Sequence, residues 1–226
     1  MHQFLILLKI YLKIIYHNHL LKFITSILMF MSTLQYLINP EVFGYTKYTF
    51  CIQNTLVLCT LVKLCLFFSI NSLDHKDGWL EALLSSSSAY VIVISKFCAL
   101  SLLSLFFSFI QTILSFIFYN DVEQICSLCD SSQLSMLYFG TTIFSVSIFI
   151  DSLIVLFSSM VKFFQKTGYI LSALILPVVL PINIVASIVL QNNPSMFLML
   201  CGVNCIVIPI SILLSSHLVQ HSYNIV

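Results

Sequence analysis

The stretch of residues 89–119 is built from apolar and small polar side chains and contains a single charge, Lys96. A helix that crosses a membrane needs about 20 predominantly apolar residues. The rest of the chain has the same character, because 60% of its 226 residues are hydrophobic and only 8% are charged. Soluble domains are about 25% charged, so the sequence predicts an all-α, polytopic membrane protein.

Short polar segments divide the chain into six apolar ones, which predicts about six transmembrane helices within a single membrane domain, residues 1–226. The expected spans cover residues 23–38, 48–70, 89–119, 134–160, 168–190 and 195–216. The third of these is longer than the bilayer core requires, so we expect it to be tilted or broken. No soluble domain fits between the spans.

Residues 1–22 predict a helix that lies at the membrane surface. Lys9, Lys13 and His17 follow one another at four-residue intervals, which places them on one stripe of a helix. The opposite side is apolar and consists of Leu7, Leu8, Tyr11, Ile14 and Ile15. This pattern is typical of an interfacial helix with its lysines toward anionic lipid; an early start of the first span is the alternative.

The distribution of lysines predicts the orientation. Lysines gather in residues 9–22, 76–96 and 162–166, which all fall on one side of the membrane if the chain crosses it six times. The segment 120–133, on the other side, has acidic residues and no lysine. Because loops rich in lysine stay in the cytoplasm, we expect both termini to be cytoplasmic.

The charge-dense segment 72–88 predicts a cytoplasmic elbow with a short coupling helix. Asp77 is placed to cap this helix, and Glu81 lies in its first turn, where the helix dipole favours an acid. Apolar pairs at i and i+4 are Trp79 with Leu83 and Leu80 with Leu84. Such a helix suits the docking of a soluble partner; the alternative is a solvated turn with Trp79 anchored at the interface.

The run Asp74–Lys96, DHKDGWLEALLSSSSAYVIVISK, resembles the DG-x-LE-x-LL-x-S signature of the CcmB family, the membrane (permease) subunit of the haem-exporter ABC transporter of cytochrome c maturation. Residues 138–147, YFGTTIFSVS, and Gly168–Pro181, GYILSALILPVVLP, are similar to two further elements of that family. The chain departs from the pattern at Ser85–Ser88, where the family has Ser-Pro, and at Asp151, where it generally has a small residue.

The resemblance implies a permease that couples ATP hydrolysis on a separate CcmA-like ATPase to haem transfer or to release of a CcmE-like haem chaperone. CcmC-like and CcmD-like membrane subunits are the other implied partners. The expected ATPase contacts are Asp77, Gly78, Trp79, Leu80, Glu81, Leu83 and Leu84. Pro177 and Pro181 would break the fifth span. The expected location is the bacterial inner membrane, or alternatively the mitochondrial inner membrane, with two copies of the chain or one copy beside a related subunit.

Several kinds of chemistry have no motif in this chain. No pair of glycines forms the phosphate-binding pattern G-x-x-x-x-G-K-[ST], so ATP is expected on a partner. No basic run indicates nucleic-acid binding. All six histidines fall on cytoplasmic or interfacial segments, so we expect neither a metal nor a haem ligand here, and no catalytic residue. Cys126 and Cys129 suggest a redox or haem-thiol role or, more simply, incidental loop cysteines or a local disulfide.

Three ionisable side chains fall inside expected spans: Lys63, Lys96 and Asp151. Counted at 1.5 Å per residue, each lies about 10–13 Å from the cytoplasmic end of its span. A lone charge at such depth is costly, so we expect Asp151 to pair with Lys63 or Lys96. The alternative is that each lysine extends to the interface.

Two other functions stay open. An ion-coupled secondary transporter would use Asp151 as its ion site and would show inverted repeats. A membrane assembly factor that transports nothing would share the same composition.

Overall fold

The structure is a computed structural model that describes residues 2–17, 19, 22–23, 26, 30, 34, 54–58, 60–61, 63, 79–118, 132–163, 181–182, 185 and 195–224. Its helices are α1 (His2–His17), α4 (Trp79–Ser86), α5 (Ala89–Phe118), α6 (Ser132–Phe163) and α8 (Ser195–Asn224). Every described residue except Ser87 and Ser88 is helical. The predicted all-α class is therefore confirmed.

Three helices among the described residues are long and apolar enough to cross a membrane: Ala89–Leu114 in α5, Tyr138–Met160 in α6 and Phe197–His221 in α8. They coincide with the expected spans 89–119, 134–160 and 195–216. The expected spans 23–38, 48–70 and 168–190 lie outside the described residues except at scattered positions, so a total of six remains a prediction.

The continuity of α5 and the C-terminal end of α8 add to what the sequence predicts. α5 is one continuous helix of 30 residues, about 45 Å long, so the alternative of a broken third span is excluded, whereas its tilt remains a prediction. α8 continues to Asn224 and contains Pro209, whereas the apolar run predicts an end near residue 216. The helix continues past the apolar run because its backbone hydrogen bonds form whether the side chains are apolar or polar.

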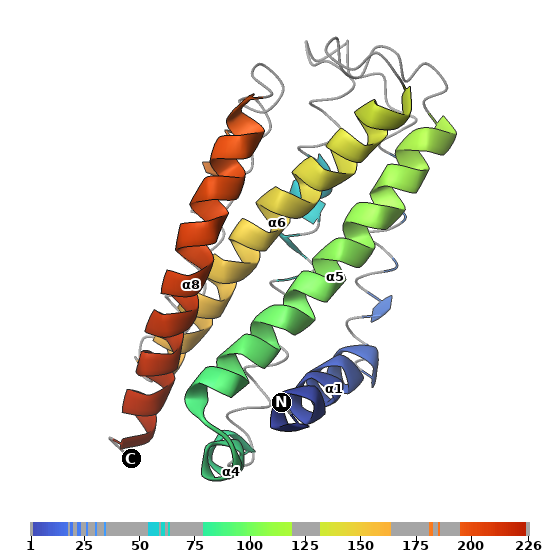
Figure 1. The fold of residues 1–226 in the computed structure, drawn as a ribbon. Helices are drawn as coiled ribbons and strands as arrows, with labels where there is room; N and C mark the ends of the chain where they lie inside the picture. Colours follow the sequence, from blue (N-terminus) through green and yellow to red (C-terminus); the bar gives the residue numbers. More distant parts are fainter. Residues whose placement is uncertain are drawn as a thin grey trace.

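α6 lies between α5 and α8, and the three long helices run side by side (Figure 1). Their shared core includes Phe107 on α5, Ile143 and Ile150 on α6, and Val219 on α8. The span in α6 is 61% buried within the chain, whereas that in α8 is only 11% buried. The outward side of α8 is nevertheless apolar, with Leu198 74% exposed, as suits a helix that faces lipid or another membrane subunit.

α1 and α4 lie at the lower end of the long helices in Figure 1, the end at which α8 finishes. α1 packs beside the lower part of α5. α4 joins α5 through a tight turn, in which the Ser87 amide donates to the Leu83 carbonyl and the amides of Val91 and Ile92 donate to the Ser88 carbonyl.

Candidate functional site

A buried ion pair joins α6 to the described residues around position 63. Lys63 Nζ lies 2.9 Å from Asp151 Oδ1, and both side chains are 0% exposed. The ammonium group also donates to the Ser147 carbonyl at 3.0 Å. The prediction that Asp151 pairs with Lys63 or Lys96 is confirmed, with Lys63 as the partner.

α5 supplies a third group to this site. Ser104 Oγ lies 2.6 Å from Asp151 Oδ2 and 3.0 Å from the Leu100 carbonyl. A hydroxyl has one proton to donate, and the ionised carboxylate at the shorter distance is the stronger acceptor. The polar site therefore connects three helical segments, which hold Lys63, Ser104 and Asp151.

The ion pair lies near the middle of the membrane-capable spans. Asp151 is about 14 Å along the helix axis from Met160, and Ser104 is about 22 Å from Ala89 and 15 Å from Leu114, at 1.5 Å per residue. The complete burial of Lys63 shows that its ammonium does not extend to the interface. At this depth a partner charge is the main compensation for the cost of burial.

Lys96 occupies a separate place, closer to the lower end of α5. Its side chain is buried, and its Nζ lies 5.6 Å from the centre of the Tyr11 ring on α1. This distance allows a cation–π interaction. Lys96 thus belongs to the contact between α1 and α5, and not to the Asp151 ion pair.

Sequence reasoning missed Ser104 and Ser147, because single serines are common in apolar helices. A signal was present in α5, where Ser104, Ser108 and Gln111 follow one another at i, i+4 and i+7 and are all buried. Such a stripe marks one face of a helix, and in a membrane span a polar face points toward protein more often than toward lipid.

A close approach of α5 and α6 lies above the ion pair. Ser108 Oγ donates to the Gly140 carbonyl at 2.7 Å, and Thr112 Oγ1 donates to the Ser108 carbonyl at 2.8 Å. A Cβ atom at Gly140 would meet Thr112 Oγ1 at 2.6 Å. The absent side chain at position 140 therefore sets how closely the two helices pack.

A second polar contact joins α6 to α8. Asn204 Nδ2 donates to the Ser145 carbonyl at 2.9 Å and lies 3.0 Å from Ser145 Oγ. The Asn204 Oδ1 atom is buried without a hydrogen-bond partner among the described residues.

We expect Asn204→Leu to change the free energy of unfolding by less than about 1 kcal/mol. Interhelical hydrogen bonds in membranes average about 0.6 kcal/mol, and the substitution also removes the unpartnered Oδ1 atom. Unfolding in mixed micelles measures this difference, and a loss above about 2 kcal/mol would show that Asn204 contributes more than an average interhelical hydrogen bond.

The lower end of the bundle is closed by contacts among α1, α4 and α5. Gln3 Nε2 donates to the Ser86 carbonyl at 2.9 Å, which links α1 to the end of α4. Leu83 packs in a cluster with Leu7, Tyr11 and Ile92. The amphipathic N-terminal segment and the short elbow helix thus form one structural unit.

The residues predicted to contact an ATPase divide into three groups. Asp77 and Gly78 lie outside the described residues. Trp79, Leu80 and Glu81 belong to α4, although their side chains are not described. Leu83 is buried in the chain's own core, and Leu84 packs against the same core. The surface of Leu83 is therefore occupied within this chain.

The structure describes only one of the other residues singled out in the sequence. Pro181 is helical and exposed, whereas Pro177, Cys126 and Cys129 lie outside the described residues. Within the described helices, no group of three or more His, Cys, Asp or Glu side chains is arranged to hold a metal ion.

The described helices define an all-α protein in which three helices are long and apolar enough to cross a membrane. The chain is 30% identical over 210 residues to protein RC0356 of Rickettsia conorii. The aligned region covers 92% of this chain and 91% of the relative. It is also 30% identical over 210 residues, with the same coverage, to protein RP268 of Rickettsia prowazekii. The chain belongs to the family of these two proteins, both of which are named as uncharacterised. No family model and no solved structure matches the chain.

Proposed function

We propose that the chain is the permease subunit of an ABC-type haem exporter that acts in cytochrome c biogenesis. The observation that carries the proposal is the joined pair of short helices at one end of the spans, where Gln3 on α1 bonds the last residue of α4. A permease whose movement is driven by a soluble ATPase needs such an element, which packs against the membrane spans and contacts the ATPase on the cytoplasmic side. The resemblance of residues 74–96 to the CcmB signature supports the same conclusion.

The arrangement suggests a route for coupling. α4 leads into α5 through Ser87 and Ser88, with hydrogen bonds across the turn, so a displacement of α4 is transmitted to α5. α5 carries Ser104, which contacts Asp151 on α6. Nucleotide-driven closure of the ATPase would move α4 and α5 together and re-pack the spans around the ion pair.

The remaining parts of the proposal come from the resemblance. The ATPase would be a CcmA-like subunit in the cytoplasm, and CcmC-like, CcmD-like and CcmE-like proteins would handle haem. The permease would act in the bacterial inner membrane with both termini cytoplasmic, either as two copies or beside a related subunit.

The ion-coupled transporter is the weaker candidate. Asp151, its proposed ion site, is already neutralised by Lys63 at 2.9 Å. A coupling cation would have to displace an ammonium group that is also held by the Ser147 carbonyl.

The experiment is co-isolation of the ABC ATPase with the tagged, full-length chain. We expect Asp77→Lys with Glu81→Lys to lower ATPase recovery at least about tenfold, because reversed charges at a partner surface cost several kcal/mol. Gln220→Lys is the matched control, since it adds positive charge at an exposed position on α8 near the same end, and its recovery should equal that of the wild type. Full ATPase recovery with the doubly reversed variant would overturn the proposal.

A further inference from the structure

α1 has three sides, and among the described residues one of them packs into a hydrophobic cluster with α4 and α5. Leu7 and Tyr11, which are 3% and 1% exposed, face the core that contains Ile92 and Leu83. The apolar side expected from the sequence to lie in lipid is therefore covered by α4 and α5. Contact of α1 with its surroundings must involve the other two sides.

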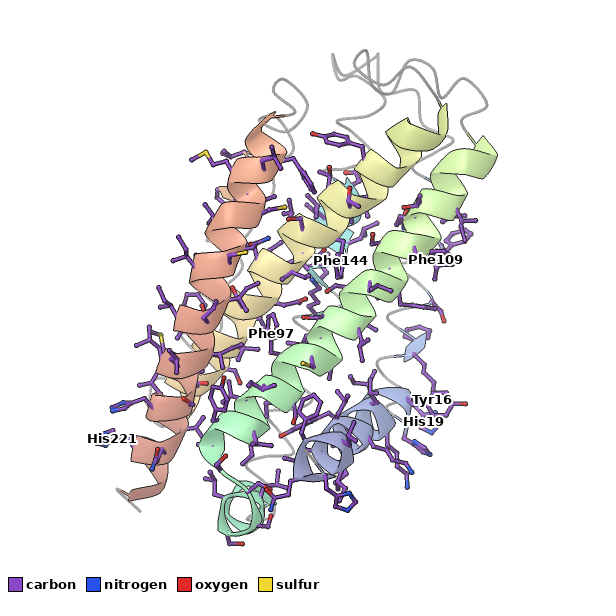
Figure 2. All side chains as sticks on the ribbon, viewed as in Figure 1. Tyr16, His19, Phe97, Phe109, Phe144 and His221 are labelled. Atoms are coloured by element: carbon purple, nitrogen blue, oxygen red, sulfur yellow. The ribbon has the colours of Figure 1, made fainter. Side chains whose placement is uncertain are left out.

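The second side is apolar and exposed. Leu5, Leu12 and Tyr16 lie within a narrow arc of the helix at 100° per residue. Leu5 is 53% exposed and Tyr16 is 68% exposed. Figure 2 places Tyr16 on the part of α1 that points away from the long helices. We call Leu5, Leu12 and Tyr16 the apolar strip.

The third side is cationic and adjoins the apolar strip. Lys9, Lys13 and His17 are exposed along one stripe of the helix, and α1 itself contains no acidic residue. Lys22 reaches the same region, with its Nζ 4.3 Å from the centre of the Tyr16 ring. We call Lys9, Lys13 and His17 the basic strip.

From these strips we infer that α1 binds anionic phospholipid, with headgroup phosphates on the basic strip and the upper acyl chains against the apolar strip. Three observations favour lipid over an acidic protein. The two strips run side by side along a helix, which is the pattern of interfacial helices. Tyr16 is an aromatic residue of the kind that anchors at the membrane interface. The helix packs beside the lower part of α5, close to Ala89, where the membrane-capable span begins.

The lipid site would also stabilise the lower end of the bundle. Lipid that holds the outer sides of α1 keeps its inner side on α5 through Tyr11 and Lys96 and keeps Gln3 on Ser86. The inference does not depend on the permease role, because it uses only the surface and position of α1.

The test is native mass spectrometry of the full-length protein in detergent, titrated with phosphatidylglycerol or phosphatidylcholine. We expect the wild type to prefer phosphatidylglycerol. Because each lysine near an anionic surface contributes appreciably to attraction, Lys9→Gln with Lys13→Gln should weaken phosphatidylglycerol binding about thirtyfold and leave phosphatidylcholine binding unchanged. The matched control is Lys9→Arg with Lys13→Arg, which keeps both charges and should stay within about twofold of the wild type.

A second variant tests the apolar strip. Leu5→Ser with Leu12→Ser should weaken binding of both lipids, because each lipid loses apolar contact, while helix content measured by circular dichroism stays unchanged.

Equal wild-type affinity for the two lipids, or phosphatidylglycerol affinity that survives loss of both lysines, would overturn the inference. Release of a bound acidic polypeptide by the glutamine variant, without a change in lipid binding, would identify a protein as the occupant and also overturn it.

Discussion

Asp151→Asn should lower the free energy of unfolding by about 3–5 kcal/mol, the usual result of removing one partner of a buried ion pair. The substitution is nearly equal in size, so the loss comes from charge and not from packing. It leaves the Lys63 ammonium, 0% exposed, with the Ser147 carbonyl and with no countercharge among the described residues. Unfolding of the purified protein in mixed micelles, followed by far-ultraviolet circular dichroism, measures the change.

The partner variants distinguish an ion pair from a general packing defect. Lys63→Met alone should be similarly destabilising, because it leaves a buried carboxylate. Combining Lys63→Met with Asp151→Asn removes both charges and should recover most of the lost stability. Ser104→Ala should cost less, about 1.5–3 kcal/mol, since it removes one hydrogen bond to a charged group. If the double variant were as unstable as the sum of the single ones, the ion pair would not be the source of the effect.

Gly140→Leu should destabilise the contact between α5 and α6 by about 1–3 kcal/mol through overpacking. Even the first added atom would meet Thr112 Oγ1 at 2.6 Å. Rotation of Thr112 relieves that contact only by breaking its hydrogen bond to the Ser108 carbonyl. The same unfolding measurement applies.

Gly202 on α8 provides the matched control. An added Cβ there meets nothing within 4 Å, so Gly202→Leu should leave stability unchanged or slightly raised, since glycine is a poor helix former. Alanine substitutions test the contact between Gly140 and Thr112 itself. Gly140→Ala should lower the free energy of unfolding less in a Thr112→Ala background than in the wild type. Equal effects of leucine at positions 140 and 202 would show that the spacing of α5 and α6 does not depend on Gly140.

Much of the fold follows from local properties of the chain. The apolar run from Ala89 and the runs that form α6 and α8 predict helices whatever their neighbours are, because in lipid a backbone must satisfy its own hydrogen bonds. The same holds for α1, whose lysines repeat at helical spacing. The depth of Asp151 within its span also follows from counting residues, and this depth was enough to predict that a lysine partner exists.

Contacts between helices were decided only by the tertiary structure. Lys63 and Lys96 lie at similar expected depths, so depth cannot choose between them; the choice depends on how α5 and the residues around position 63 rotate about α6. The structure brings Lys63 to Asp151 and turns Lys96 toward Tyr11. Sequence spacing identifies the residues that share a face of one helix, but not the surface that this face meets.

The same reason explains α1 and α4. The sequence by itself determined that both helices are amphipathic, because amphipathicity is a property of spacing along one helix. Only packing decided that the apolar side with Leu7 is covered by protein, that Leu83 faces inward, and that Leu5 and Tyr16 remain outside. An apolar side chain gains by leaving water whether it meets lipid or protein, and the sequence of a single helix does not distinguish these two surroundings.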